Sequence, residues 1–500
     1  MRSSTVLSSR RPARTIEVLL LGLAAAVAAA ACAPRETGTL AAATETLGVA
    51  NVRSISYSGT GRWFQFGQAP SPTLPWPAFD VSRFAATISY ETPAARVEMV
   101  RKQVIEPGRV RPAPVEQRPV QVVSGTFAWN MAAPPGGGEP APQPQPAAVE
   151  ERTMEIWSTP HGFLKAAAAN NASSQPAEGG SEVSFTVGGK YRYVGRINAQ
   201  SQVERVQTWI DNTVLGDTTV EITYSDYRDF GGVMFPGRIV RTQGGHPVLE
   251  LNISEVAANP EVKIDVPETV RSFTPPAVRV DVEKLANGVY YLKGGSHHSV
   301  AIDQRDHIVV VEAPQDEARS AAVIDKVKEA IPKKPIRYLI NTHVHFDHSG
   351  GLRTYVDEGA TIVTHQMNRP YYEQAWKTPR TLNPDRLAKS GKAATFETFT
   401  DKHVLTDGKR SIEIHQIAGN GHNDAFAMVY LPAERILMEV DAWAPAAPNA
   451  PPPAAPSPFA VNLYENIEKL KLNVSQIAAL HGPRVATLAD LRSAIGKSGD

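Results

Sequence analysis

The sequence predicts an α/β fold preceded by a mainly antiparallel β domain, so we expect two domains of different class. The first observation is length, because 500 residues exceed the ~250 that one hydrophobic core usually supports. The second is a change of pattern after Pro275 and Pro276, where alternating strands give way to short apolar strands separated by helical segments. We place the β-rich domain at residues 40–275 and the α/β domain at residues 280–497.

The first 32 residues form a segment of their own. A basic start is followed by an apolar run over residues 18–31, which is shorter than the ~20 residues that a membrane-spanning helix needs. Cys32, the only cysteine, comes directly after three alanines and resembles the modified cysteine of a bacterial lipoprotein signal. The alternative is an ordinary cleaved signal peptide. Either predicts export to the periplasm or outer membrane, with membrane contact only through a lipid anchor at Cys32.

The β-rich half shows apolar side chains at every second position, which predicts strands with one buried face. This alternation covers Phe84, Ala86, Ile88 and Tyr90 and returns over residues 220–224 and 249–253. A Pro-, Gly- and Ala-rich stretch at residues 132–148 has too few large apolar groups to build a core, and we interpret it as a mobile loop.

The second half alternates strands with helices. Residues 307–311 are predicted as an apolar strand, and residues 317–331 as a helix because alanine, valine and isoleucine recur at steps of about four. Another strand is predicted at residues 336–340. Lysine plus arginine and aspartate plus glutamate balance at 51 each, so nothing in the composition suggests nucleic acid as a ligand. The partner that we expect is a small-molecule substrate.

The most informative segment follows the strand at residues 336–340 and has the pattern His-x-His-x-Asp-His. In an extended segment, side chains two positions apart project to the same side, so His343 and His345 can hold one cation together. Asp347 and His348 follow where the chain turns, and can face a second cation. Imidazole and carboxylate donors suit zinc, and iron or manganese accept the same donors.

This motif resembles the metal-binding motif of the metallo-β-lactamase superfamily, and further histidine and aspartate residues follow in the expected order. His422 lies in a Gly-His-Asn segment, Asp441 follows an apolar strand at residues 435–440, and His481 follows a predicted helix at residues 464–472. The resemblance implies an αββα sandwich that binds two Zn²⁺ per chain. It assigns His343, His345 and His422 to one metal, Asp347, His348 and His481 to the other, and Asp441 to both.

The resemblance also implies a reaction. Two metals lower the pKa of a shared water towards ~7, and the resulting hydroxide is the expected nucleophile. Asp347 would orient this hydroxide and take its proton as a general base. The best-known zinc β-lactamases carry a cysteine where this chain has Asp441. We therefore favour hydrolysis of an ester, lactone or amide, with β-lactams still open because the protein is expected to be exported.

Three residues outside the motif are candidate substrate contacts. His297 and His298 lie in an early turn that often borders the active-site mouth in this fold, with solvated turn histidines as the alternative. Trp443 follows Asp441 and begins a Pro- and Ala-rich run that extends to Pro458. This run is either a lid or specificity loop, or an insertion without substrate contact.

Two functions of other classes stay open. Iron held by His343, His422 and Asp441 would resemble the sulfur dioxygenases of the same superfamily, which are oxidoreductases. Alternatively, the β domain is the working part, because residues 227–236 resemble part of the curved sheets of periplasmic lipoprotein carriers. That resemblance implies a binder of lipid or lipoprotein.

Overall fold

A computed structural model describes residues 37–133, 137–447 and 455–497. The predicted signal segment at residues 1–32, including Cys32, lies outside the described residues. Among the residues described, no helix is long and apolar enough to cross a membrane.

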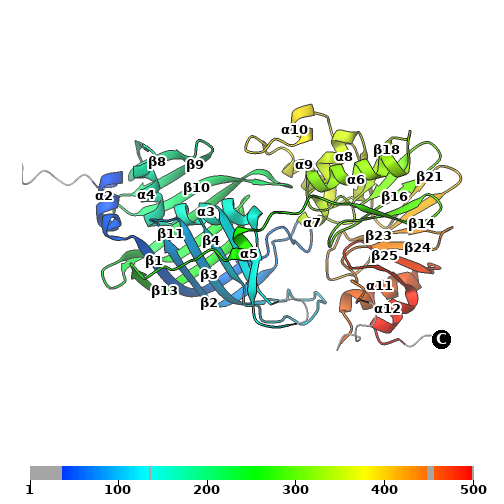
Figure 1. The fold of residues 1–500 in the computed structure, drawn as a ribbon, viewed down its shortest axis with the longest axis horizontal. Coiled ribbons are helices and arrows are strands. Elements are labelled where there is room, and N and C mark those ends of the chain that lie inside the picture. The colour runs from blue at the N-terminus through cyan, green and yellow to red at the C-terminus, as the bar shows by residue number, and fades with distance from the viewer. Residues whose placement is uncertain (1–36, 134–136, 448–454, 498–500) are drawn as a thin grey trace, which may run out of the picture.

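The first domain is built on one antiparallel sheet of 13 strands, drawn in blue to green in Figure 1. Its order is β6-β5-β4-β3-β2-β1-β13-β12-β11-β10-β9-β8-β7, so sequence neighbours pair except β6 and β7, which form the two edges, and β1 pairs with β13. The strands are β1 (Ser54–Phe64), β2 (Ala78–Ser89), β3 (Ala94–Gln103), β4 (Val120–Ser124), β5 (Phe127–Ala132), β6 (Ala141–Pro144), β7 (Ser173–Ala177), β8 (Gly180–Val187), β9 (Tyr191–Asn198), β10 (Val203–Asn212), β11 (Gly216–Asp229), β12 (Met234–Gln243) and β13 (His246–Ala258).

The predicted alternation is confirmed in β2. Phe84, Ala86 and Ile88 are buried, while the side chains between them are partly exposed. The buried face of the sheet packs on helices that the alternation did not predict. These helical segments are α2 (Leu40–Thr46), η1 (Val49–Asn51), η2 (Pro146–Ala148), α3 (Val149–Ser158) and α4 (Pro160–Ala169). Helix α5 (Glu268–Arg271) packs on the opposite face, where Val270 contacts Val122 and Trp129.

Helices α3 and α4 follow each other through one residue, Thr159. Its hydroxyl accepts a hydrogen bond from the Gly162 amide, and Pro160 occupies the first turn of α4, so both residues favour a helix start. Ile156 and Phe163 are fully buried against the sheet. The helices therefore supply the cover that one face of the sheet needs.

The prediction of a mobile loop at residues 132–148 is wrong for residues 141–148. Residues Ala141–Pro144 form β6, which pairs with β5 at the edge of the sheet, and Pro146–Ala148 form a 3₁₀ turn. Proline is tolerated here because an edge strand needs hydrogen bonds on one side only. Residues 134–136 lie outside the described part.

The second domain has two sheets packed face to face, with helices on the outside (Figure 1). The first sheet contains β14 (Asp281–Ala286), β15 (Val289–Lys293), β16 (Ser299–Asp303), β17 (Ile308–Val311), β18 (Ile336–Ile340), β19 (Thr361–His365) and β20 (Phe396–Phe399). The second contains β21 (Lys402–Thr406), β22 (Ser411–Gln416), β23 (Ala427–Leu431), β24 (Ile436–Glu439), β25 (Gln476–Ala479) and β26 (Val485–Thr487). The helices are α6 (Glu317–Ala330), α7 (Phe346–Ser349), α8 (Leu352–Glu358), α9 (Asn368–Ala375), α10 (Arg386–Ser390), α11 (Pro458–Lys469) and α12 (Leu488–Ala494).

The layers of the second domain follow from the apolar residues on the two faces of its strands. Val309 on β17 packs with Ile414 on β22 between the sheets, whereas Val310 faces Val323 of α6 on the outer side. Successive residues of β17 are thus buried on opposite faces, as expected for a central strand covered on both sides. The predicted αββα sandwich is confirmed. Helix α11 begins at Pro458, six positions before the predicted start, because the Pro- and Ala-rich run ends there with a proline in the first turn.

The two domains touch at several places, including an ion pair between Arg109, in the connection from β3 to β4, and Asp424. Asp217, in the β10–β11 hairpin, accepts hydrogen bonds from the backbone amides of Thr381 and Leu382. The side chain of Arg380 donates to backbone carbonyls of the same hairpin. A further contact joins the segment between β1 and β2 to the start of α7, which lies on the side of its domain that faces the β domain (Figure 1).

Candidate metal centre

The His-x-His-x-Asp-His segment lies where the buried strand β18 ends. His343 and His345 follow the strand, are almost inaccessible to solvent and have ring centroids 4.4 Å apart. Asp347 and His348 lie in α7, the single helical turn that follows. The end of a central strand and one helical turn therefore gather all four side chains.

The first cluster combines this segment with two others. The cluster consists of His343, His345, His422 and Asp441, whose donor atoms all lie within 4.8 Å of one another. His422 precedes β23, and its amide is held by the Asn420 side chain at 3.0 Å. Its Nε2 is 2.9 Å from Asp441 Oδ2, and His343 Nε2 is 3.3 Å from the same oxygen.

A second cluster lies directly beside the first. It consists of His297, Asp347, His348 and His481, again with donor atoms within 4.8 Å of one another. Asp347 Oδ2 is 3.3 Å from His297 Nε2 and 3.6 Å from His348 Nε2. Asp441 also reaches this cluster, because its Oδ2 is 3.1 Å from His348 Nε2 and its Oδ1 is 2.6 Å from His481 Nδ1.

The structure thus brings together all seven predicted metal ligands and places Asp441 between the clusters. It adds His297, which the sequence indicated only as a candidate substrate contact. The His297 ring stacks on His481 at 3.9 Å, and the two residues form an isolated antiparallel bridge. His297 therefore lies among the donor atoms, and its position is one that a ligand could occupy.

The other two candidate substrate contacts differ from each other. His298 is not brought into either cluster, because its Nε2 contacts the Gly482 carbonyl at 2.7 Å and its Nδ1 accepts from the Gly294 amide at 3.1 Å. Trp443 lines a cavity next to Asp441, together with Pro112 and Ala113 of the β domain. Residues 448–454 of the Pro- and Ala-rich run lie outside the described part, so the proposed lid stays a prediction.

Several residues that support the clusters were missed in the sequence. Glu312 is fully buried after β17, and its Oε2 is 2.8 Å from His348 Nδ1 while its Oε1 accepts from the Thr342 amide. The Thr342 hydroxyl lies 3.0 Å from His343 Nδ1. A polar residue at the carboxyl end of a buried strand is a usable signal for Glu312. The Gln68 side chain, which donates to Asp347 Oδ1 at 2.8 Å, has no such signal because it comes from the other domain.

The electrostatics favour a cation at this place. Burial lowers the pKa of His343 to about 4, so its ring is neutral at pH 7 and has a lone pair to offer. Burial alone would raise the pKa of Asp441, but His348 and His422 hold it well below the usual range. Burial would likewise lower the pKa of His348, but Asp441 and Glu312 raise it well above the usual range. The site therefore stabilises positive charge.

The donor atoms also fit a metal ion. His345 Nδ1 is buried without a hydrogen-bond partner among the described residues, although it faces the rings of His343 and His422. A buried polar atom without a partner is costly, and a metal ion would satisfy it. Neutral imidazoles with two carboxylates are donors that zinc accepts, so the residues present fit this metal.

Comparison with known proteins finds a family match and similar solved structures. Residues 292–438 match the family described as the metallo-beta-lactamase superfamily. Similar solved structures include a metallo-beta-lactamase from Pontibacter korlensis (16% identity, 44% of this chain, 98% of that chain, TM-score 0.33). Another is the metallo-beta-lactamase FIM-1 from Pseudomonas aeruginosa in its mono-zinc form (18% identity, 45% of this chain, 96% of that chain, TM-score 0.33). No curated protein matches the chain.

The family match begins at Leu292 on β15 and ends at Met438 on β24, so it contains the His-x-His-x-Asp-His segment and His422. The remaining members of the two clusters, Asp441 and His481, follow within the same pair of sheets. The C-terminal half of this chain therefore contains a domain of the metallo-beta-lactamase fold.

Proposed function

We propose that the C-terminal domain is a zinc-dependent hydrolase that cleaves an ester, lactone or amide at a two-metal site. The observation that carries this proposal is the pair of adjacent clusters that share Asp441. One carboxylate in contact with histidines of both clusters fits two cations bound a short distance apart. Two bound zinc ions would polarise the substrate carbonyl and supply hydroxide at neutral pH.

The protein's own residues have separate tasks in this proposal. His343, His345 and His422 hold one metal, and His348 and His481 hold the other, with His297 at the rim of the second cluster. Asp347 keeps one oxygen towards the second cluster. Burial would raise its pKa, but the hydrogen bond with His297 and the charge of His348 hold it below the usual range. Asp347 is therefore ionised at neutral pH and can orient the attacking water.

The cavity beside Asp441 supports a substrate with an apolar acyl part. It is lined by the Trp443 side chain and by alanine and proline residues from both domains. Among the described residues that line it, Asp441 carries the only charge. An apolar group loses no hydrogen bonds to water when it enters such a cavity, whereas a charged group would be buried without a partner.

The test is metal analysis of protein purified without chelators, paired with hydrolysis of a chromogenic lactam, a lactone and a simple ester. We expect about two zinc per chain and turnover of at least one substrate, with both lost in His345→Ala. His365→Ala is a matched control, because this buried histidine lies in the same domain but outside both clusters. One iron per chain without hydrolysis would overturn the proposal and favour the dioxygenase alternative.

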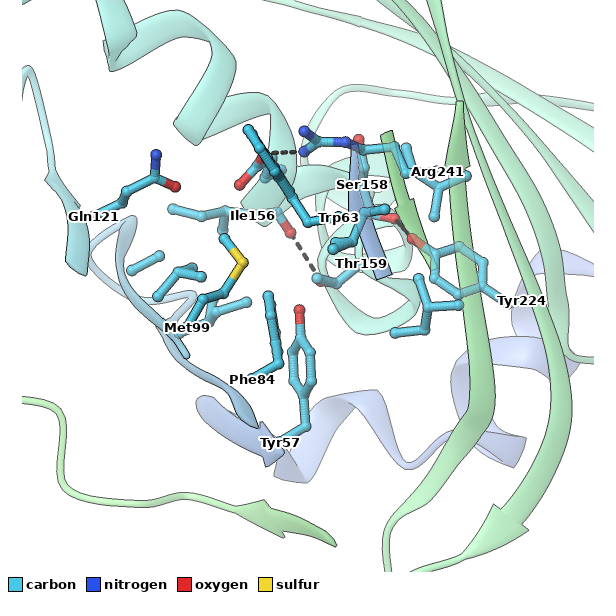
Figure 2. A pocket seen from close by; sticks show the side chains of 17 residues that line it. Tyr57, Trp63, Phe84, Met99, Gln121, Ile156, Ser158, Thr159, Tyr224 and Arg241 are labelled. Atoms are coloured by element: carbon cyan, nitrogen blue, oxygen red, sulfur yellow. Dashed lines mark hydrogen bonds and ion pairs between the residues drawn. The ribbon is translucent and has the colours of Figure 1, made fainter. Parts of the chain in front are cut away.

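A second function is favoured by one observation in the β domain. Helix α3, Thr159 and one face of the sheet enclose a mostly apolar cavity of about 90 Å³ (Figure 2). Figure 2 shows Tyr57, Phe84 and Met99 pointing towards this space, and Tyr57 stacks on Phe84 at 5.9 Å. We propose that this cavity holds part of an acyl chain, in keeping with the lipid-binding alternative.

This second proposal is tested on full-length protein purified without detergent. Its organic extract should contain an acyl lipid, and Met99→Trp, which fills the cavity, should lose that lipid. An extract without lipid, together with no uptake of a fluorescent fatty acid, would overturn the proposal and leave the β domain as a structural element.

A further inference from the structure

The segment between β1 and β2 of the β domain contacts the metal centre at three successive points. It contains Phe66, Gly67, Gln68 and Ala69, and each contact is made to a residue of the His-x-His-x-Asp-His segment. Those contacts come from nearly 280 positions away in the sequence. The family match begins only at residue 292, so this segment lies outside the matched domain.

The first contact anchors Phe346, the residue between His345 and Asp347. Its ring lies edge-on to Phe66 at 5.2 Å and to Trp76 at 6.4 Å, in a small apolar cluster of the β domain. Its amide donates to the Gly67 carbonyl at 3.1 Å. Gly67 has φ +77°, and a Cβ there would lie 2.6 Å from the Phe346 ring. The close approach therefore requires glycine.

The second contact fixes the ring of His345. His345 Nε2 lies 2.9 Å from the Ala69 carbonyl, which can only accept, so Nε2 carries the proton. Nδ1 is then the nitrogen with the free lone pair, and it is the one without a hydrogen-bond partner among the described residues. The Ala69 carbonyl also accepts from the Asn423 side chain at 2.9 Å, next to His422. One carbonyl thus orders both sides of the first cluster.

The third contact holds Asp347. Gln68 Nε2 donates to Asp347 Oδ1 at 2.8 Å, and this leaves Oδ2 as the oxygen that faces His297 and His348. A hydrogen bond to the outer oxygen of a ligating carboxylate fixes which oxygen meets the metal. The same reasoning applies to the imidazole held by Ala69.

We infer that the segment from Phe66 to Ala69 is a working part of the metal centre, with Gln68 as a positioning residue for Asp347 and the Ala69 carbonyl as one for His345. The β domain then completes the site and is more than an appended module. This inference rests on the proposed metal centre, and its test measures metal affinity in place of turnover.

The test compares zinc affinity of full-length variants by competition with a chromogenic chelator. Gln68→Ala should weaken zinc binding about 10- to 100-fold, as loss of a residue that supports a metal ligand typically does. Gln65→Ala is the matched control, since it lies in the same segment and its side chain makes no hydrogen bond to a described residue. Gly67→Ala should also weaken binding, because the added Cβ pushes the segment away from Phe346.

Thermal unfolding of the metal-free proteins separates positioning from general damage. We expect Gln68→Ala and wild type to unfold at the same temperature without metal. Equal zinc affinity in Gln68→Ala, Gln65→Ala and wild type would overturn the inference, as would a parallel loss of affinity and metal-free stability. A wild type that binds no divalent metal would instead overturn the proposed function itself.

Discussion

His161 in the β domain and His345 in the C-terminal domain are both buried, and each has Nδ1 without a hydrogen-bond partner among the described residues. In both, Nε2 lies close to a backbone carbonyl, at 3.0 Å for His161 and 2.9 Å for His345. Their neighbours differ. The His161 ring stacks on Phe235, whereas His345 faces two more histidines and the Asp441 carboxylate. A single unpaired nitrogen is therefore a weak sign of a metal site, and convergence with carboxylates is a strong one.

The buried carboxylates of the two domains also differ in their partners. In the β domain, the mostly buried Arg241 pairs with Glu155 and lies 3.7 Å from Glu151, so the protein supplies its own cation. At the metal centre, Asp347, Asp441 and Glu312 contact histidines, and no lysine or arginine of the described chain forms an ion pair with them. Buried carboxylates without a fixed cation are costly. The metal centre is thus the cluster whose carboxylates contact only histidines, an arrangement that a bound cation would stabilise.

The largest expected effect that tests this comparison is loss of the shared carboxylate. Asp441→Asn removes the charge between the clusters and should weaken zinc binding by about 3 kcal/mol or more, which is about 100-fold or more. The measurement is chelator competition together with zinc content by mass spectrometry. Asp424→Asn is the control, because this carboxylate pairs with Arg109 outside the clusters. Two zinc retained with unchanged affinity in Asp441→Asn would show that Asp441 does not connect two metals.

The sequence predicted the C-terminal domain better than the first domain for a physical reason. Its strands are covered on both faces and its ligands must occur as particular residue types, so apolar runs and histidine patterns are visible in the sequence. In the β domain, the edge strand β6 is rich in proline, and the helix α3 that follows has Glu150 and Glu151 in its first turn and a buried arginine, Arg152. β6 forms by pairing with β5, and α3 packs on β3, β4 and β10, contacts that the local pattern of apolar residues does not reveal. Gln68 was invisible for a similar reason, since its partner lies 279 positions later.

The next effect concerns pH and the buried histidine of the β domain. Burial lowers the pKa of His161 to about 4 from 6.5, so the unfolded chain binds more protons than the folded one between these values. Stability from this group is fully present above pH 6.5 and is lost as the pH falls towards 4. The slope is about 1.4 kcal/mol per pH unit, or about 3 kcal/mol over the window.

Urea unfolding of the metal-free protein at several pH values measures this loss, with His161→Phe as the reference variant. The variant keeps a ring against Phe235 but cannot bind the proton. The free energy of unfolding of wild type should therefore approach or fall below that of the variant as the pH decreases. Parallel curves from pH 6.5 to 4 would mean that His161 is protonated equally in both states.

The smallest effect concerns the ion pair between Arg241 and Glu155 in the β domain. Arg241→Met leaves Glu155 without its partner, and we expect a loss of about 2 kcal/mol in the free energy of unfolding. We expect this loss in the free energy of unfolding to be smaller than for a fully buried ion pair, because the Glu155 side chain is 34% exposed and keeps contact with water. Adding Glu155→Gln should recover part of the loss, since the uncompensated charge is then gone.

The control is Arg96→Met, at an exposed ion pair with Glu98, which should cost less than about 1 kcal/mol in the same urea experiment. If both arginine variants lower the free energy of unfolding by the same amount, burial does not set the cost of losing an ion pair. The contrast between the Arg241–Glu155 pair and the metal centre would then lose its physical basis.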